Sequence, residues 1–407
     1  MIRKTVSFKI HQRHLDKYRA QYPLLFKEAL MGSHLLETGE IEEGTLLNLT
    51  DEHNKYVATG YYGRQNKGFG WVLTKNNNEK IDKIFFKKKL YTAFEKRMGL
   101  YNNPKTNAFR VFNGEGDGIG GLTIDFYNGY YLINWYSLGI YTFQDEIVQS
   151  LKEIVEFDGI YEKKRFGNAP ETDDGFLAGK PAEFPIIIKE NGESLAVYFN
   201  DGAMVGVFLD QREVRRNLRN QFAKGQNVLN LFSYTGAFSV FAAKGGAAKT
   251  TSVDLANRSL ERTRENFLLN NINPDTQEIV VEDVFNYLQL CVKKRIKYDV
   301  VILDPPSFAK SKDYVFSAEK DYATLLGETV KITRTNGLVI ASNNSSTISA
   351  DKFKQLIGKA FNLAKARFEI VEFHQLPKDF KTSHSYPESN YLKVAVIKVL
   401  RKERTIS

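Results

Sequence analysis

The chain has 407 residues, of which 42% are apolar and 26% are charged. This length is more than one small core needs, and the composition excludes an intrinsically disordered protein. No apolar run approaches the ~20 residues that cross a bilayer, and the N-terminus lacks the apolar segment of a signal peptide. We therefore expect a cytoplasmic protein that binds no membrane. The sequence has one cysteine, Cys291, which excludes an internal disulfide framework.

The formal net charge is +9, and most of the excess lies in the first quarter of the chain. Residues 1–100 contain 18 Lys and Arg against 11 Asp and Glu, including the run Lys87, Lys88 and Lys89. A basic region on an enzyme-sized chain indicates a polyanionic partner such as nucleic acid. A solvated basic surface would give the same count. His11 and His14 have no further ligand residues near them in the sequence, so we expect no metal site.

The first 180 residues predict two small domains. Residues 1–76 contain short alternating strands broken by Asp, Asn and Gly, which is typical of a small β-barrel. Residues 77–180 predict an α+β domain, starting with a helix whose apolar face contains Ile84, Phe85, Leu90 and Phe94. The glycines in "NGEGDGIGG" do not lie between a strand and a helix, so we interpret them as a hairpin turn and not as a nucleotide loop.

Residues 181–407 alternate between strand and helix patterns. This alternation predicts an α/β domain with a mostly parallel sheet, Rossmann-like, covered by helices on both faces. Ligands of such sheets bind outside the carboxyl ends of the strands. The residues that follow each predicted strand are therefore the candidates for a binding site.

Polar groups follow four consecutive predicted strands. After the first, Gly236 permits a tight turn, and Ser233 and Thr235 are expected to cap the next helix. Asp254 follows the second strand and suits the two hydroxyls of a ribose, whereas Asp283 follows the third and suits an adenine amine. A single carboxylate after a strand is more often a helix cap. Four polar groups in register predict a nucleoside pocket.

The fourth strand ends abruptly in "VILDPPSFAKSK". Pro305 and Pro306 cannot continue a strand ladder because they have no N–H to donate. The strand end therefore presents the Asp304 carboxylate, rigid carbonyls and Phe308 to a ligand. The alternative is that the prolines only terminate the strand.

Several of these stretches resemble a known family. "FSYTGAFSVFAAKGGA", "SVDLANRSLERTRENFLLN" and "VILDPPSFAKSK" are similar to motifs of class I S-adenosylmethionine-dependent methyltransferases. Together with "GVFLDQREVRR", "NGEGDGIGGLTID" and "YVATGYYG", they resemble bacterial 23S rRNA large-subunit methyltransferases with an N-terminal PUA domain. The resemblance implies a PUA-like domain over 1–76, a central domain over 77–180 and a methyltransferase domain over 181–407. It also implies an RNA partner, 23S rRNA or an assembling large subunit. The oligomeric state, monomer or homodimer, stays open.

The resemblance also implies which residues form the site. S-adenosylmethionine would contact Phe208, Asp210, Arg212, Asn230, Phe232, Ser233, Tyr234, Thr235, Gly236, Asp254, Ser259, Asp283 and Asp304. At the acceptor side, Asp304, Pro305 and Pro306 would orient the target base by hydrogen bonds, and Phe308 would stack on that base after it leaves its own stack. Lys87, Lys88 and Lys89 would contact the RNA.

One part of the family pattern is missing. Relatives that methylate carbon 5 of cytosine have a cysteine after the fifth strand, because a thiolate must first attack carbon 6. Here that stretch is "IASNNSSTIS", with Asn343 beside the expected substrate, and Cys291 has the pattern of a buried helix residue. We therefore predict a nitrogen acceptor, guanine N7 or an exocyclic amine. The alternatives are a cytosine-5 enzyme without a cysteine, a non-catalytic RNA-binding protein, and a small-molecule methyltransferase.

Overall fold

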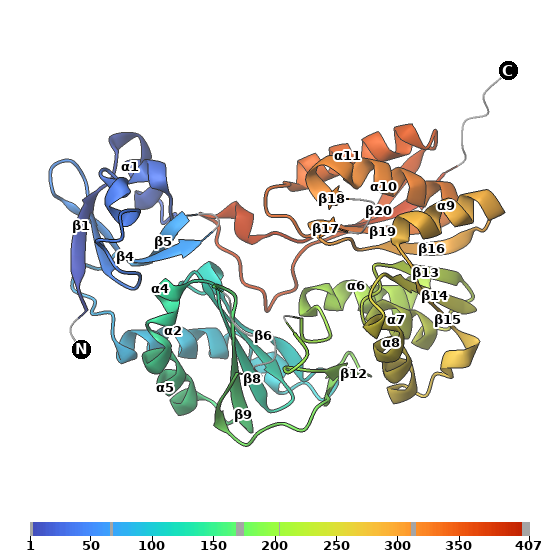
Figure 1. Ribbon diagram of the computed structural model, residues 1–407, viewed down its shortest axis with the longest axis horizontal. Coiled ribbons are helices and arrows are strands. Elements are labelled where there is room, and N and C mark those ends of the chain that lie inside the picture. Colours follow the sequence, from blue (N-terminus) through green and yellow to red (C-terminus); the bar gives the residue numbers. More distant parts are fainter. Residues whose placement is uncertain (1–2, 66–67, 168–174, 203, 311–314, 401–407) are drawn as a thin grey trace. The chain divides into compact units, whose positions relative to one another are not determined.

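The computed structural model describes residues 3–65, 68–167, 175–202, 204–310 and 315–400 (Figure 1). The chain forms two compact units. The first contains Met1–Ile186, Tyr198–Val205 and Lys378–Ser389, and the second contains Ile187–Val197, Gly206–Pro377 and Asn390–Ser407. None of the helices in the described ranges is long and apolar enough to span a membrane. The boundary expected near residue 76 does not separate the units and stays a prediction.

The first sheet of the first unit has the strand order β1-β3-β4-β5-β2. β1 is parallel to β3, and the other neighbours are antiparallel. A backbone bridge between Ile10 and Leu30 joins the chain after β1 to the chain after β2, as a small barrel requires. The elements of this region are β1 (Thr5–Lys9), α1 (Gln12–Arg19), β2 (Leu24–Leu25), β3 (Leu46–Thr50), β4 (Tyr56–Gln65) and β5 (Gly68–Thr74).

The second sheet of this unit has the order β10-β9-β8-β7-β6, with only β8 and β9 parallel. The helix before it buries Phe85 and Leu90 as expected, but Ile84 is 76% exposed, so its assignment to the apolar face is wrong. The elements are α2 (Lys83–Glu95), α3 (Met98–Tyr101), β6 (Ala108–Asn113), β7 (Leu122–Tyr127), β8 (Tyr130–Trp135), α4 (Leu138–Tyr141), α5 (Gln144–Ile154), β9 (Gly159–Lys164) and β10 (Phe176–Gly179).

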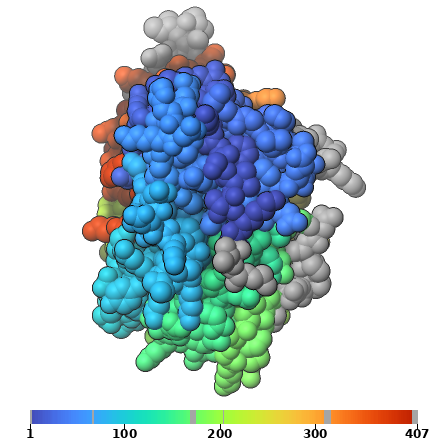
Figure 2. Space-filling view, turned by 90° about the vertical axis from the view of Figure 1, so that its left-hand side faces the viewer, coloured from blue at the N-terminus to red at the C-terminus, as the bar shows by residue number. Residues whose placement is uncertain are grey.

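The glycine-rich segment 114–121 connects the antiparallel strands β6 and β7, which confirms the predicted hairpin turn. Its glycines allow close packing. A Cβ on Gly120 would lie 2.1 Å from the ring of Trp71 in the barrel, and a Cβ on Gly116 would lie 1.8 Å from the carbonyl oxygen of Lys381. Figure 2 shows the barrel, in blue, directly beside the cyan and green residues that follow it in the sequence. The segment is therefore a packing surface within the first unit.

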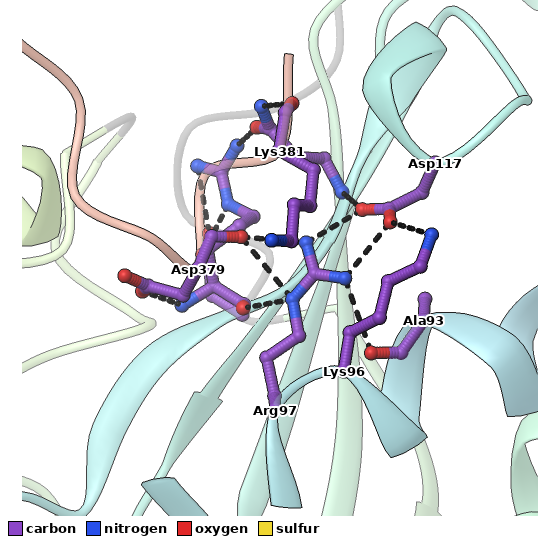
Figure 3. Close-up of polar contacts among 9 residues, drawn as sticks. Ala93, Lys96, Arg97, Asp117, Asp379 and Lys381 are labelled. Carbon is purple, nitrogen blue, oxygen red and sulfur yellow. Dashed lines mark hydrogen bonds and ion pairs between the residues drawn. The ribbon is translucent and has the colours of Figure 1, made fainter. Parts of the chain in front are cut away.

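A buried ion pair joins three parts of the first unit (Figure 3). The Arg97 guanidinium donates to both carboxylate oxygens of Asp117, at 2.8 and 2.6 Å, and both side chains are almost fully buried. Arg97 also donates through Nε to the carbonyls of Arg110 and Asp379, each at 3.2 Å. The Lys381 carbonyl accepts from the Asn113 amide at 2.7 Å. The segment 378–389, late in the sequence, is thereby held against β6.

The second unit contains a seven-stranded sheet in the order β15-β14-β13-β16-β19-β21-β20. The first five strands are parallel, and β21 is antiparallel to β19 and β20. This arrangement confirms the predicted mostly parallel Rossmann-like sheet. The strands are β13 (Asn227–Leu231), β14 (Lys249–Asp254), β15 (Glu278–Val281), β16 (Tyr298–Leu303), β19 (Thr333–Asn343), β20 (Phe368–His374) and β21 (Lys393–Val399).

Helices cover this sheet, and its central strands β13, β14, β16 and β21 are mostly buried, as parallel strands between helices usually are. Two short ladders accompany it. The helices and short strands are β11 (Ile186–Glu190), β12 (Glu193–Val197), α6 (Arg212–Asn217), α7 (Ala237–Lys244), α8 (Arg258–Leu269), α9 (Val284–Lys294), β17 (Phe308–Lys310), β18 (Val315–Ser317), α10 (Ala318–Ile332) and α11 (Ala350–Leu363).

Candidate active site

The carboxyl ends of β13, β14, β15, β16 and β19 lie at one edge of the second unit's sheet, because these five strands run in parallel. The residues that follow these strands are the ones predicted from the sequence. All of the predicted cofactor-binding residues, together with the predicted acceptor residues 304–308 and Asn343, belong to this unit. The site is built around this edge.

The loop after β13 has an unusual backbone. Phe232, Tyr234 and Gly236 adopt left-handed conformations, with φ of 57°, 51° and 74°. Left-handed bulky residues are uncommon and cost free energy, and they cluster at functional sites. The predicted caps are wrong: α7 begins after Gly236 without a side-chain cap, and the Thr235 hydroxyl donates instead to the carbonyl of Gly206 at 2.5 Å. The left-handed Gly236 turns the chain, so these hydroxyls do not bond the N–H groups of the helix.

Three buried hydroxyls in this loop and in α8 have no hydrogen-bond partner among the described residues. They are Ser233 Oγ, Ser259 Oγ and Thr263 Oγ1. Buried polar groups are nearly always paired, so unpaired ones beside a strained loop indicate a ligand. S-adenosylmethionine, which the resemblance implies, has a carboxylate, an amine and two ribose hydroxyls that could pair with them. The residues present therefore fit this cofactor.

Asp254 and Asp283 follow β14 and β15. Asp254 accepts the N–H of Tyr234 at 2.8 Å and that of Ala256 at 3.0 Å, one at each oxygen. A carboxylate accepts about four hydrogen bonds, so further lone pairs of Asp254 are available to ribose hydroxyls. Asp283 is the N-cap of α9, and its Oδ1 accepts the N–H of Phe285 at 2.8 Å. Asp283 thus caps a helix, which was the alternative role of such a carboxylate, and its contact with adenine stays a prediction.

Other predicted cofactor residues differ in their surroundings. Asn230 is buried, and its amide donates to Ser239 at 3.0 Å, inside the layer between sheet and helix. Phe208 is 41% exposed, and its ring lies 5.6 Å from that of Tyr234, so these rings border the loop. Arg212 is buried, with Nε 3.5 Å from the neighbouring Glu213 carboxylate. Of these residues, only Phe208 and Tyr234 present a surface that a ligand can reach.

Asp304 lies at the end of β16, where the prolines terminate the strand as predicted. Its carboxylate accepts hydrogen bonds from the Ser342 hydroxyl and from the Gln211 amide, the latter at 3.1 Å. The pKa of Asp304 is raised to about 6, mainly by burial and also by the nearby carboxylate of Asp210. A partly buried carboxylate with a raised pKa at a strand end is a candidate functional group.

The residues after Asp304 point in different directions. Pro305 is buried, whereas Pro306 is exposed and Phe308 is 62% exposed. The Ser307 hydroxyl donates to Asn344 Oδ1 at 2.6 Å, which connects this segment to the loop after β19. The ring of Phe308 is therefore available for stacking, and its backbone is held by β17 pairing with β18.

No thiol lies at the end of β19. Asn343 is buried there, and its Oδ1 accepts the N–H of Ser345 at 3.1 Å. Cys291 lies inside the core, fully buried, with burial raising the pKa of its thiol. A raised thiol pKa disfavours the nucleophilic thiolate.

The three predicted RNA-contacting lysines lie on α2 in the first unit. Lys87 pairs with Glu153 at 2.8 Å, and Lys88 is exposed. Lys89 is half-buried, with its ammonium 5.4 Å from the Phe85 ring centre, and burial lowers its pKa. Only Lys88 is thus both exposed and outside an observed ion pair. In the described ranges, no group of three His, Cys, Asp or Glu residues could hold a metal ion.

Sequence reasoning missed four residues at this edge: Gln211, Ser342, Tyr391 and Lys393. Gln211 and Ser342 bond Asp304, and Tyr391 donates its hydroxyl to Asp210 at 2.9 Å. Tyr391 and Lys393 were missed because they lie at or just before the beginning of a strand, whereas the predicted site residues follow the ends of strands. Since β21 is antiparallel, its beginning lies where β19 ends. Had the last strand been expected to be antiparallel, its first residues would have been placed at this edge of the sheet.

Comparison with known proteins adds independent findings. Residues 159–382 match the family described as S-adenosylmethionine-dependent methyltransferase, and residues 8–75 match the PUA-like domain. YwbD of Bacillus subtilis (strain 168), whose name places it with the ribosomal RNA large subunit methyltransferases, is 52% identical over 392 residues, which is 95% of this chain and 98% of that protein. Ribosomal RNA large subunit methyltransferase I of Alteromonas mediterranea is 30% identical over 387 residues, 94% of this chain and 96% of its own. The crystal structure of SMU.776 complexed with SAH is 37% identical, with a TM-score of 0.88, and the match covers 97% of this chain and 100% of that one.

Proposed function

Because the chain belongs to the S-adenosylmethionine-dependent methyltransferase family, among its ribosomal RNA large subunit members, we propose that it methylates a nitrogen atom of a base in 23S rRNA. The predictions of the enzyme class and of S-adenosylmethionine as cofactor are confirmed. Guanine N7 and an exocyclic amine are the favoured acceptors. When bound, the cofactor supplies a methyl group on a positively charged sulfur, which a nitrogen lone pair can attack directly.

The observation that favours nitrogen is the absence of a usable thiol. Carbon 5 of cytosine becomes nucleophilic only after a thiolate adds to carbon 6. The sequence contains one cysteine, and it is fully buried in the core. At the end of β19 the residues are Ser342, Asn343 and Asn344, which offer hydrogen bonds but no nucleophile. A nitrogen acceptor needs only positioning, which these side chains can provide.

Asp304 and Phe308 are the residues that we expect to hold the base. With a pKa of about 6, Asp304 is ionised at neutral pH and can accept an N–H from the base. The carbonyl of Pro305 can accept a second hydrogen bond. Phe308, with its exposed ring, can stack on the base after the base has left its RNA stack. Asn343 lies beside this position and can contact the base edge.

The RNA chain would contact the first unit. A PUA-like domain covers residues 8–75, and most of the net positive charge of the chain lies in residues 1–100. Because phosphate contacts release counterions, the affinity for rRNA should fall steeply as the salt concentration rises. Lys88 is the expected contact among the three lysines of α2, since its side chain is exposed and Lys87 is paired.

The test is an inventory of methylated nucleosides in 23S rRNA by mass spectrometry, from cells with and without this protein. Loss of one nitrogen-methylated base supports the proposal, and the purified protein should restore that base on rRNA from the deficient cells. Loss of 5-methylcytidine would refute the nitrogen acceptor. An unchanged inventory would indicate an RNA-binding role without catalysis. If the Asn343→Ala variant restores the methylated base at the wild-type rate, Asn343 is not part of the site.

A further inference from the structure

Lys393 is a buried cation at the acceptor edge of the sheet. It is the first residue of β21, and its Cα pairs with that of Asn343, the last residue of β19. The residue is 2% exposed. Burying a charge is costly unless the charge is paired, so a buried lysine at a ligand-binding edge calls for a physical explanation.

Two backbone carbonyls hold the Lys393 ammonium. Nζ donates to the carbonyl of Ser345 at 2.6 Å and to that of Tyr391 at 2.7 Å. In the described part of the chain, no carboxylate forms an ion pair with it. Burial lowers its pKa to about 8, with no opposing charge. The group is therefore bound by neutral acceptors, and its charge is not compensated by an anion.

Two hydrogen-bonded paths start at this ammonium. On one side, Ser345 bonds to Asn343 through its N–H, and the next residue along, Asn344, accepts from Ser307, which precedes Phe308. On the other side, the hydroxyl of Tyr391 donates to Asp210.

The second path also reaches Asp304. Asp210 is followed by Gln211, whose amide donates to the Asp304 carboxylate at 3.1 Å. The proposed stacking ring and the proposed base-binding carboxylate are thus connected through one ammonium group.

We propose that Lys393 is a positioning residue of the methyl transfer. Its ammonium fixes the loop after β19 against the segment before β21, and it thereby keeps Phe308 and Asp304 in the correct position relative to each other. This inference rests on the proposed function. The loop 343–345 has no regular pairing beyond Asn343, so Lys393 supplies its connection to the sheet. A displacement of about 1 Å at such a site costs about 100-fold in rate. Lys393 would not touch the base.

The experiment compares Lys393→Met with Lys398→Met in the full-length protein. Methionine keeps the apolar stem and removes the donor. Lys398 lies near the other end of β21, away from the acceptor edge, and is the matched control. We would measure kcat and KM on 23S rRNA from deficient cells, and the Kd for S-adenosylhomocysteine by calorimetry. For Lys393→Met we expect kcat to fall at least about tenfold, with the Kd changed less than about twofold. Lys398→Met should match the wild type in all three quantities.

The split between kcat and Kd separates positioning from a general structural role. An unchanged kcat, or a Kd that weakens as much as kcat falls, would overturn the inference. If Lys393→Met does not fold, Lys393→Gln decides, because its uncharged amide nitrogen is one bond nearer the backbone than the ammonium and so does not occupy the ammonium's position between the two carbonyls. A reduced kcat with an unchanged Kd then supports the inference, and a wild-type kcat refutes it. A wild-type product methylated on carbon would refute the proposed acceptor but leave this comparison intact.

Discussion

Two carboxylates, buried Asp117 in the first unit and partly buried Asp304 in the second, show how differently a protein can treat the same group. Asp117 of the first unit is enclosed by partners: it receives two hydrogen bonds from Arg97 and one from the N–H of Asn113 at 2.8 Å, and Lys96 lies 3.7 Å away (Figure 3). Among the described residues, Asp304 of the second unit receives two, from the neutral side chains of Ser342 and Gln211. The first carboxylate is fully compensated and serves the fold. The second retains capacity for a ligand.

The loops beside these carboxylates differ in the same way. The glycine-rich segment 114–121 uses glycines because neighbouring atoms occupy the space of a Cβ. The loop 232–236 instead places Phe232 and Tyr234 in left-handed conformations that glycine would adopt more easily, and it leaves a buried hydroxyl unpaired. Strain with unpaired polar groups thus indicates a binding site, whereas strain relieved by glycine indicates packing.

The largest expected effect is the loss of the buried ion pair. Arg97→Met leaves the Asp117 charge buried without its main partner, which typically costs about 3–5 kcal/mol. The free energy of unfolding of the first unit should fall by this amount, as measured by denaturant titration. The matched control is Lys27→Met, which removes an exposed pair with Glu37 and should cost less than about 1 kcal/mol. Equal losses in the two variants would mean that Arg97 is not the centre of a structural cluster.

Asp304→Asn should affect catalysis most. The variant keeps the shape but replaces the charged acceptor, and we expect kcat on rRNA to fall about 100-fold, which equals roughly 3 kcal/mol. The binding of S-adenosylhomocysteine should change less than kcat, because Asp304 is only one of the expected cofactor contacts and those around 232–236 are untouched. A wild-type kcat in this variant would show that Asp304 has no part in the reaction.

Phe308→Leu tests base stacking. Removing an aromatic partner costs about 1–3 kcal/mol per stacked base, so kcat/KM should fall about tenfold or more. Phe176→Leu is the control, since Phe176 is also partly exposed but lies in the first unit. If both variants behave alike, exposure of an aromatic ring and not its place in the site determines the result.

The smallest effect concerns pH. A carboxyl whose pKa is raised in the folded state adds stability at pH below its unfolded pKa, and this stability is lost as pH rises through about 6. Removing the titration by Asp304→Asn should therefore raise Tm relative to the wild type more at pH 7.5 than at pH 4.5. Because Asp304 keeps some exposure, we expect the stabilisation of the variant over the wild type to differ by about 1 kcal/mol between the two pH values. A difference in Tm that is independent of pH would contradict the raised pKa.

The sequence was sufficient to place the strand ends. Asp254, Asp283 and Asp304 lie at one edge because the strands before them are parallel. The sequence marks each of these strands by a hydrophobic run that ends in polar residues. It was not sufficient for the loop after β13, where backbone conformation overrides cap preference, so Ser233 and Thr235 were wrongly assigned as caps. The contribution of Lys393 depends on β21 being antiparallel, a tertiary property. Ile84 was misassigned because an apolar residue on a helix can face solvent at little cost.

The segment 378–389 has a consequence for biosynthesis. Tyr386 packs its ring against Trp71 and Tyr22, and the Asp379 carbonyl accepts from Arg97, so residues from the end of the chain complete the core of the first unit. A ribosome adds only about 5–20 residues per second. After residue 205 has been added, the first unit therefore has to wait roughly 10 to 40 s, until residue 389 has been added, before its core is complete.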